Sequence, residues 1–206
     1  NGEILVEHNA EEPLPPASLT KMMTAYIAER EITEGRMSFD DQVPVSVKAW
    51  KTGGSRMFIR EGTEVQLEDL LRGIIIQSGN DASVAVAEYI AGSEDVFADV
   101  MNQTAISLGM TNTQFKNATG LPQEGHYTTA KDLSILAARI IQDFPDTYPI
   151  YEEKNFTYNG IKQANRNSLL FRDPTVDGLK TGYTRVAGYG LVASAQREGM
   201  RLVSVV

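Results

Sequence analysis

Residues 15–35 read PPASLTKMMTAYIAEREITEG, and this stretch decides how the first part of the chain folds. The two prolines that open it hold the backbone extended, because proline fixes φ and is excluded from helix interiors. From Ala17-Ser18 a helix is predicted to about Ile32, ended by Gly35. Its apolar residues recur at helical spacing, so we expect a helix that is mostly buried; they are Met22, Met23, Tyr26 and Ile27.

Outward from this helix, the middle of the chain is predicted to be helical. Residues 36–65 are turn-rich, and helical periodicity with end signals then predicts helices over 67–76, 82–91, 94–108 and 129–143. Strand-like segments lie nearer the two ends of the chain. They cover 3–8, 156–160, 176–182, 189–196 and 201–206, and the last two read as a hairpin.

This order of elements predicts an α/β (α+β) fold. We expect an antiparallel sheet built from both chain ends, with a helical lobe inserted between them. The whole of 1–206 is interpreted as a single domain, with a sheet lobe over about 1–40 and 154–206 and a helical lobe over about 41–153. Because the chain starts almost directly on a strand-like run and stops inside another, we expect it to have been cut from a longer chain at both ends.

Composition excludes several classes of function. The 206 residues carry 27 acidic and 19 basic side chains, a net charge of −8, and the Lys and Arg residues are scattered, so no nucleic-acid-binding surface is expected. The chain has no cysteine and two histidines, His8 and His126, so we expect neither a metal site nor a cofactor, and a general base other than histidine. No apolar run approaches the roughly 18 residues of a membrane span.

Three short motifs follow one another in a fixed order and together point to nucleophilic serine chemistry. They are Ser18-Leu19-Thr20-Lys21, Ser78-Gly79-Asn80 and Lys180-Thr181-Gly182, which fit S-x-x-K, S-x-N and K-T-G. On a helix, positions i and i+3 share a face, so the Lys21 amine is expected within reach of the Ser18 hydroxyl. Lysine acts as a base only when burial or neighbouring cations lower its pKa, and a buried first helix with Lys180 nearby would supply both.

Each motif also has a structural interpretation. Ser18 could be a helix N-cap beside a solvated Lys21, and the Ser78 turn could simply end one helix and cap the next. In the functional interpretation Ser78 relays a proton and the Asn80 amide holds a substrate amide. A second K-T-G at Lys51 precedes Ser78 in a turn-rich segment, and we interpret it as coincidental. His126 is interpreted as a loop histidine near a helix cap and is left out of the catalytic set.

The chain resembles the low-molecular-mass penicillin-binding proteins of the D-alanyl-D-alanine carboxypeptidase family. The resemblance rests on 16–24, 77–82 and 176–184 and extends over 53–58, 165–167 and 187–195, so it covers nearly the whole chain. It implies a β-lactamase/transpeptidase-like fold and a serine peptidase that removes the terminal D-alanine from peptidoglycan pentapeptide stems. It also implies β-lactam antibiotics as covalent inhibitors, no cofactor, and an exported protein at the periplasmic or extracytoplasmic face, bound to the membrane only through a C-terminal anchor absent from this chain.

By the same resemblance, Ser18 would form the acyl-enzyme, Lys21 would accept its proton and Ser78 would complete the proton network. The terminal carboxylate of the substrate would be received by Lys180 and Thr181 with help from Arg166. The oxyanion would be held by the backbone N–H of Ser18 and by one after Gly182, near Tyr183. The full set of expected substrate-binding residues is Asn80, Arg166, Lys180, Thr181, Gly182 and Tyr183.

Two other functions remain as alternatives. A class A β-lactamase deacylates with a glutamate in an E-x-x-L-N segment, and no such segment lies between Asn80 and Lys180; the nearest acidic run, at 152–155, has the wrong spacing. The other alternative is a non-catalytic penicillin-binding wall sensor of the same fold. It is disfavoured because every position of the three motifs is intact.

Overall fold

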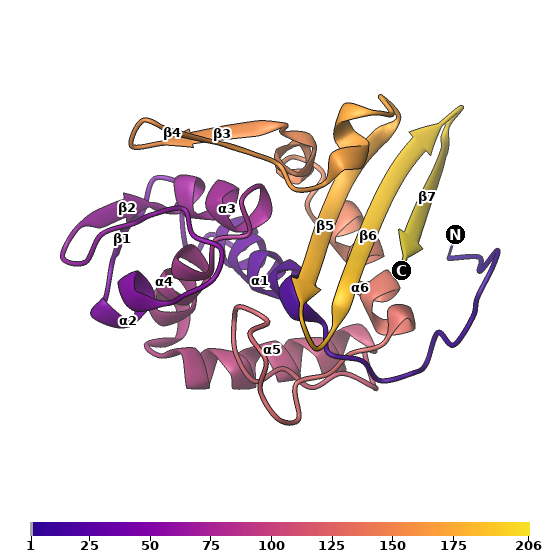
Figure 1. Cartoon of the computed structure of the whole chain (residues 1–206), viewed down its shortest axis with the longest axis horizontal. Helices are drawn as coiled ribbons and strands as arrows, with labels where there is room; N and C mark the ends of the chain where they lie inside the picture. The colour runs from indigo at the N-terminus through magenta and orange to yellow at the C-terminus, as the bar shows by residue number, and fades with distance from the viewer. Residues whose placement is uncertain (1) are drawn as a thin grey trace.

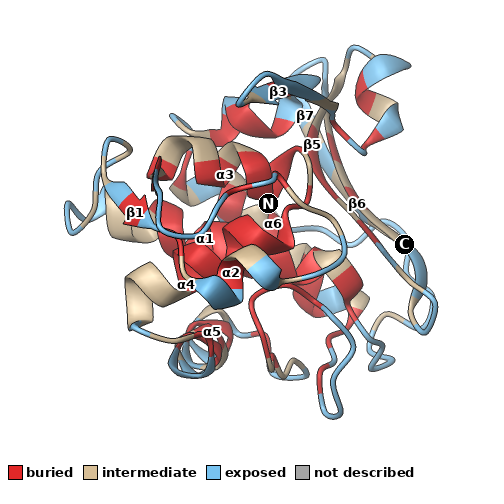
Figure 2. Cartoon of the chain, turned by 60° about the vertical axis from the view of Figure 1, so that its left-hand side comes forward, coloured by how far each residue is buried: buried red, intermediate tan, exposed pale blue. Residues whose placement is uncertain are grey.

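The buried helix α1 (Lys21–Thr33) lies at the centre of the molecule, with a cluster of helices on one side and a sheet on the other (Figure 1). The computed structural model describes residues 2–206. A 3₁₀ turn, η1 (Ala17–Thr20), precedes α1 without a break, so the predicted helix forms as a 3₁₀ turn continued by an α-helix. Residues 21–29 are all buried, as the apolar pattern predicts, and they appear red in Figure 2.

The helical side consists of three predicted helices and several short elements. The helices are α3 (Leu67–Ile75), α4 (Asn80–Ala91) and α5 (Glu94–Leu108), and their predicted positions are confirmed. Glycines end two of them because a left-handed residue is needed there: Gly92 has φ 79° and Gly109 has φ 84°. The short elements of the chain are β1 (Gln42–Pro44), α2 (Val47–Lys51), β2 (Glu64–Gln66), η2 (Tyr148–Glu152), β3 (Asn155–Tyr158), β4 (Ile161–Ala164) and η3 (Ser168–Phe171), of which η2 and η3 contact the sheet strand β5 (Val176–Thr184).

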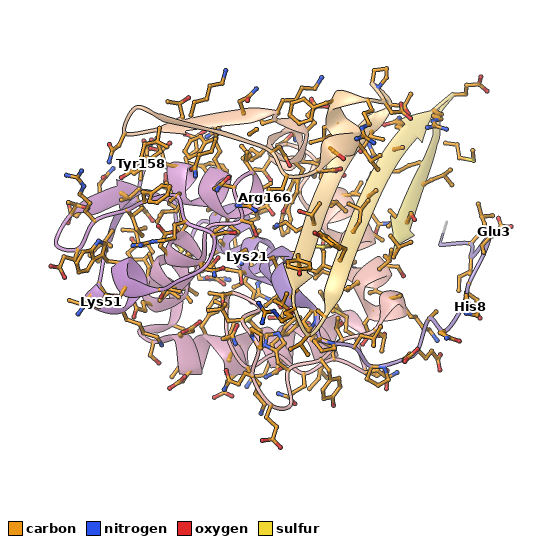
Figure 3. All side chains as sticks on the ribbon, viewed as in Figure 1. Glu3, His8, Lys21, Lys51, Tyr158 and Arg166 are labelled. Atoms are coloured by element: carbon orange, nitrogen blue, oxygen red, sulfur yellow. The ribbon has the colours of Figure 1, made fainter. Side chains whose placement is uncertain are left out.

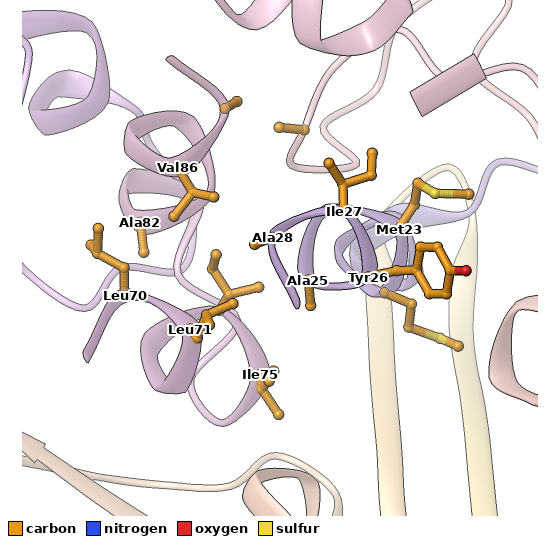
Figure 4. Close-up of a cluster of buried hydrophobic side chains, with 14 of the residues drawn as sticks. Met23, Ala25, Tyr26, Ile27, Ala28, Leu70, Leu71, Ile75, Ala82 and Val86 are labelled. Atoms are coloured by element: carbon orange, nitrogen blue, oxygen red, sulfur yellow. The ribbon is translucent and has the colours of Figure 1, made fainter. Parts of the chain in front are cut away.

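The core forms where α1 packs against α3 and α4. Figure 4 shows Ala28 of α1 on the side that faces Leu71 and Val86, with Ala25 and Ile27 on the two flanks of the helix. These five side chains are 0% exposed, so the first helical segment is held by close apolar packing. This packing keeps the N-terminal end of α1 between the two halves of the molecule.

The sheet is antiparallel and contains β5 (Val176–Thr184), β6 (Gly188–Arg197) and β7 (Met200–Val205), in that order. The β6–β7 hairpin turns at Glu198-Gly199, within the predicted connection. The mixed α/β class with an antiparallel sheet is therefore confirmed. In the part of the chain that the structure describes, β5 has a strand on only one side, and η1 packs against β5 and β6.

The predicted strand over 3–8 is wrong, and with it the expectation that both chain ends build the sheet. Residues 2–7 have no regular secondary structure, and Ile4, Leu5 and Val6 are 61%, 65% and 90% exposed. In Figure 1 the N-terminal segment lies out beyond β7 as an open coil. Alternating apolar residues show only that a segment could have a buried face; a strand also needs a neighbouring backbone to pair with.

The contacts between elements do not follow the predicted division of the chain into a sheet lobe and a helical lobe. The helix α6 (Ala130–Asp143), although its residues fall within the predicted helical lobe, packs against β7 and β6. The β3–β4 hairpin, which falls within the predicted sheet lobe, contacts α3 through β3. The sheet needs an apolar cover that its own strands do not supply, and α6, whose buried residues include Leu133, Leu136 and Ile140, packs against it. Among residues 2–206, none of the helices has the length and hydropathy to cross a membrane.

Candidate active site

The side chains of Ser18 and Lys21 meet at the junction of η1 and α1. Lys21 Nζ lies 3.2 Å from Ser18 Oγ, as the i, i+3 spacing predicts. The same nitrogen donates to Asn80 Oδ1 and to the backbone oxygen of Thr119, each at 2.6 Å. Lys21 is 1% exposed, so its amine is held by three oxygen atoms in a space closed to solvent.

The environment of Lys21 favours the neutral amine. Burial is the largest cause, and the charges of Lys180 and Arg166 add to it, so that the pKa of Lys21 lies well below its usual value. A neutral amine has two N–H groups and one lone pair. The carbonyl oxygen of Thr119 and the amide oxygen of Asn80 can only accept, so they take the two N–H groups. The lone pair is then left for the hydroxyl hydrogen of Ser18, which is the geometry of a general base.

Asn80 is positioned by a loop that also contains the second K-T-G. Its side-chain Nδ2 donates to the backbone oxygen of Gly53 at 2.7 Å, and its backbone N–H donates to that of Ser55 at 2.7 Å. Lys51 itself is exposed and lies at the far left of Figure 3, away from Lys21, so its side chain takes no part in the site. The sequence interpretation missed the backbone contribution of Gly53, which no side-chain motif indicates.

Ser78 lies two residues before Asn80 and contacts Lys180. Lys180 Nζ donates to Ser78 Oγ at 2.9 Å, and both side chains are buried. Ser78 has φ 65°, a left-handed conformation that is costly for a residue other than glycine and is typical of functional turns. The hydrogen bond that the structure shows for Ser78 is therefore with Lys180.

Lys180 and Arg166 form a positively charged corner of the site. Burial, followed by the charge of Arg166, lowers the pKa of Lys180 to about 7. Arg166 is exposed, its Nε donates to the backbone oxygen of Gln77 at 3.0 Å, and Figure 3 shows it close to Lys21. An anionic group bound here would favour the charged form of Lys180 and remove the mutual repulsion of the cations.

Strand β5 passes directly beside the turn that holds Ser18. A Cβ atom on Gly182 would lie 3.2 Å from Pro16 O and 3.3 Å from Leu19 N, so the close approach needs glycine. Thr181 and Tyr183 flank this point on β5. Tyr183 is 55% exposed, and its ring centroid lies 4.4 Å from that of Tyr189 on β6. The expected binding residues of β5 therefore line the free edge of the sheet next to Ser18.

The loop at 117–120 was not identified from the sequence, although it completes the surroundings of Lys21. Asn117 Oδ1 accepts the backbone N–H groups of Thr119 and Gly120 and so aims the Thr119 carbonyl at Lys21. Gly120 has φ 82°, and a Cβ there would lie 1.7 Å from Ala17 O. The run Asn117-Ala118-Thr119-Gly120 has turn composition, which predicts a loop but not its neighbour.

His126 stays outside the group of residues around Ser18 and Lys21. Its Nε2 lies 3.0 Å from Thr20 Oγ1, and the ring is 6% exposed. Burial and the charge of Lys116 lower its pKa to about 4, so the ring is neutral near pH 7. His126 therefore contacts η1 through the Thr20 side chain.

Together these groups supply a nucleophile, a base and a receptor for an anion along one strand edge. A serine hydroxyl beside a neutral amine is suited to acyl transfer. The cationic corner at Lys180 and Arg166 fits a carboxylate next to the bond that is attacked. The arrangement therefore suits a substrate that ends in a free carboxylate.

Comparisons with known proteins agree with this chemistry. The family model for D-alanyl-D-alanine carboxypeptidase matches residues 1–206. D-alanyl-D-alanine carboxypeptidase DacC of Escherichia coli is 47% identical over 213 residues, which cover 100% of this chain and 53% of that protein. The chain thus spans about half the length of the curated relatives it matches.

Two solved structures show the same fold. The D-alanyl-D-alanine carboxypeptidase DacD from Francisella tularensis superposes with a TM-score of 0.98 at 38% identity, covering 100% of this chain and 62% of that one. Penicillin-binding protein D2 from Listeria monocytogenes, solved in an ampicillin-bound form, superposes with a TM-score of 0.89 at 31% identity, covering 100% of this chain and 84% of that one.

Proposed function

The chain belongs to the D-alanyl-D-alanine carboxypeptidase family, and from this premise we propose that it carries the catalytic centre of a serine-type carboxypeptidase. The proposed substrate is the pentapeptide stem of peptidoglycan, from which the terminal D-alanine is released. The observation that supports the proposal most strongly is the buried Lys21 amine, 3.2 Å from Ser18 Oγ and surrounded by acceptors that leave its lone pair to the serine.

In the acylation step, Ser18 Oγ attacks the carbonyl carbon of the bond between the two D-alanines, and its proton passes to Lys21 Nζ. The oxyanion that forms is held by the backbone N–H of Ser18 and by one on β5 near Tyr183. The C–N bond then breaks, and the leaving amine takes the proton that Lys21 had accepted, which leaves Lys21 neutral again. Ser78 and Lys180, hydrogen-bonded at 2.9 Å, lie on the side of the leaving group and are placed to pass that proton.

Substrate binding is assigned to the residues along β5 and α4. The terminal carboxylate would pair with Lys180, Thr181 and Arg166, while Gly182 lets β5 approach the nucleophile. Asn80 still has one N–H of its amide free after donating to Gly53, and this group would hold a backbone carbonyl of the substrate. In deacylation, water attacks the ester carbonyl carbon and gives its proton to Lys21. The bond to Ser18 Oγ then breaks, and Oγ takes the proton from Lys21, which restores Ser18 and releases the shortened stem as a carboxylic acid.

β-Lactams would acylate Ser18 in the same way. A β-lactam-bound structure of the Listeria relative supports this. Because the chain lacks the E-x-x-L-N glutamate, we expect slow hydrolysis of the acyl-enzyme, and therefore inhibition rather than resistance. We further propose that 1–206 acts as one catalytic domain and works outside the cytoplasmic membrane, where its substrate lies.

The experiment combines intact-mass measurement with an assay of D-alanine release. Wild type should gain the mass of one benzylpenicillin and release D-alanine from a pentapeptide, and Ser18→Ala should do neither. Ser134→Ala, on the sheet-covering helix α6, is the matched control and should behave as wild type. Acylation by penicillin without any release of D-alanine would favour the wall-sensor alternative. Rapid hydrolysis of penicillin would favour a β-lactamase.

A further inference from the structure

A cavity opens beside the nucleophilic turn, at the end of β5 that carries Thr184. Its volume is about 310 Å³. It is lined by residues 15–17 just before Ser18, by the loop 120–124 with His126, and by Thr184 and Val186 at the end of β5. None of the catalytic steps assigned above uses this space.

The direction of the substrate along β5 brings its acyl part to this cavity, and this argument rests on the proposed function. The terminal carboxylate lies at Lys180, and Thr184 follows four residues later on the same strand. At about 3.3 Å per residue these positions are about 13 Å apart. A peptide that runs along the strand edge spans about 7 Å over two residues, so the residue before the terminal D-alanyl-D-alanine lies between these positions, and its side chain can extend to Thr184 and the cavity.

The cavity has one buried polar group without a partner. His126 Nδ1 makes no hydrogen bond within residues 2–206, although the ring is 94% buried and lines the cavity. If the Thr20 hydroxyl donates to Nε2, only the proton on Nδ1 is left unpaired. If Nε2 donates instead, both the Thr20 hydroxyl hydrogen and the Nδ1 lone pair are unpaired. The first tautomer leaves fewer groups unsatisfied, so Nδ1–H is a donor that lacks an acceptor.

The rest of the lining is mostly apolar, with charges only at its margin. The negative Glu124 lies in the lining but is exposed, and the positive Lys116 is close enough to His126 to influence its pKa. These two charges oppose each other, so the cavity has no strong preference for a net charge. Its apolar surface comes from Pro15, Pro16, Ala17, Leu121, Pro122 and Val186.

We propose that this cavity is an acyl-side specificity subsite. It takes the side chain of the residue before the terminal D-alanyl-D-alanine, and it selects an aliphatic chain that ends in a hydrogen-bond acceptor oxygen. The apolar lining receives the methylene groups, and His126 Nδ1–H donates to the oxygen. A carboxylate and a neutral amide share this chemistry, whereas an ammonium group has only donors and cannot pair with Nδ1–H.

The test uses N-acetyl-X-D-alanyl-D-alanine peptides and measures kcat/KM for D-alanine release. X is glycine, norleucine, lysine, 2-aminoadipic acid or the side-chain amide of 2-aminoadipic acid, the last four having side chains of similar length. The peptide with the acid, the one with the amide or both should have a kcat/KM about tenfold above that of the norleucine peptide, which is the effect of one additional hydrogen bond. The lysine peptide should show no such increase. The acid and amide together show whether the oxygen must be charged. Equal values for these four peptides would overturn the inference.

Variants separate the His126 donor from the space around it. In His126→Gln the amide reaches the position of Nε2 and keeps a partner for Thr20 but has no donor at Nδ1, so the preference for acceptor oxygens should disappear. In His126→Asn the amide lies near the position of Nδ1, so the preference should persist. Val186→Trp adds bulk at a residue that is 73% exposed. In this variant, kcat/KM for every peptide with a long X side chain should fall to the value for the glycine peptide. Survival of the preference in His126→Gln would overturn the inference.

A second readout keeps this test independent of turnover. The same peptides should slow acylation of Ser18 by a fluorescent penicillin in the same order of potency. If no peptide releases D-alanine, the proposed carboxypeptidase activity fails, and the order of protection still decides the subsite. If the glycine peptide is turned over but neither rate nor protection depends on X, the proposed function stands and the subsite is refuted. Penicillin acylation of each variant confirms that it folds.

Discussion

Gly182→Ala tests whether the close approach of β5 to the nucleophilic turn is needed for acylation. The new Cβ would lie 3.2 Å from Pro16 O, 3.2 Å from Leu19 Cγ and 3.3 Å from Leu19 N, whereas ordinary contacts begin at 3.4 Å. Two of these three atoms belong to the backbone on either side of Ser18. Relief therefore requires the strand and the turn to separate by a few tenths of an ångström. Since a misplacement of about 1 Å can cost about 100-fold in rate, we expect acylation to slow about tenfold.

The assay is the second-order rate of Ser18 acylation by a fluorescent penicillin, followed in gels, with thermal unfolding measured alongside. Gly190→Ala on the neighbouring strand is the matched control. Its Cβ would lie 3.1 Å from the end of the Leu19 side chain and 3.5 Å from the nearest backbone atom, so a rotation of that side chain accommodates it. The control should acylate within about twofold of wild type. A Gly182→Ala variant that acylates at the wild-type rate, or equal losses in both variants, would refute the reasoning.

Three other predictions concern titratable groups. Acylation of Ser18 should rise with pH as Lys21 loses its proton and level off well below the value of about 10.4 for free lysine; rates measured from pH 5 to 11 that still climb at the top of this range would contradict a buried amine base. Arg166→Gln removes a charge that lowers the pKa of both Lys21 and Lys180, so the same profile should move to higher pH, and an unchanged midpoint would argue against this electrostatic role. Burial raises the pKa of Glu29 from 4.5 to about 7, so its contribution to stability is complete below pH 4.5 and is lost as pH rises through 7. In urea unfolding, the free energy of unfolding of wild type should fall by about 3 kcal/mol relative to that of Glu29→Gln between pH 4.5 and pH 8. Parallel curves of unfolding free energy against pH for the two proteins would exclude this.

Local features of the fold were predictable because short-range interactions set them. The helix α5 has the predicted bounds, since Ser93 caps its start by accepting the N–H of Val96 and Gly109 ends it. The helix α6 likewise begins after Thr129, whose side chain accepts the N–H of Asp132. The predicted strand over 3–8 is wrong because short-range interactions alone do not form a strand. Its pattern is local, but pairing depends on a partner strand, and the described residues do not supply one.

For the site, the sequence by itself determined which side chains are present and which of them share a helical turn. Ser18 and Lys21 lie three residues apart, so their contact at 3.2 Å follows from helix geometry. The chemical state of that lysine was decided only by the tertiary structure. Its pKa falls because α1 is buried and because Lys180 and Arg166 arrive from segments about 150 residues away. Its two short hydrogen bonds come from Asn80 and the Thr119 carbonyl, which only the packing of separate loops places beside it. Desolvation and charge act through space. The sequence therefore identifies Lys21 as the base, but the tertiary structure lowers the pKa of its amine.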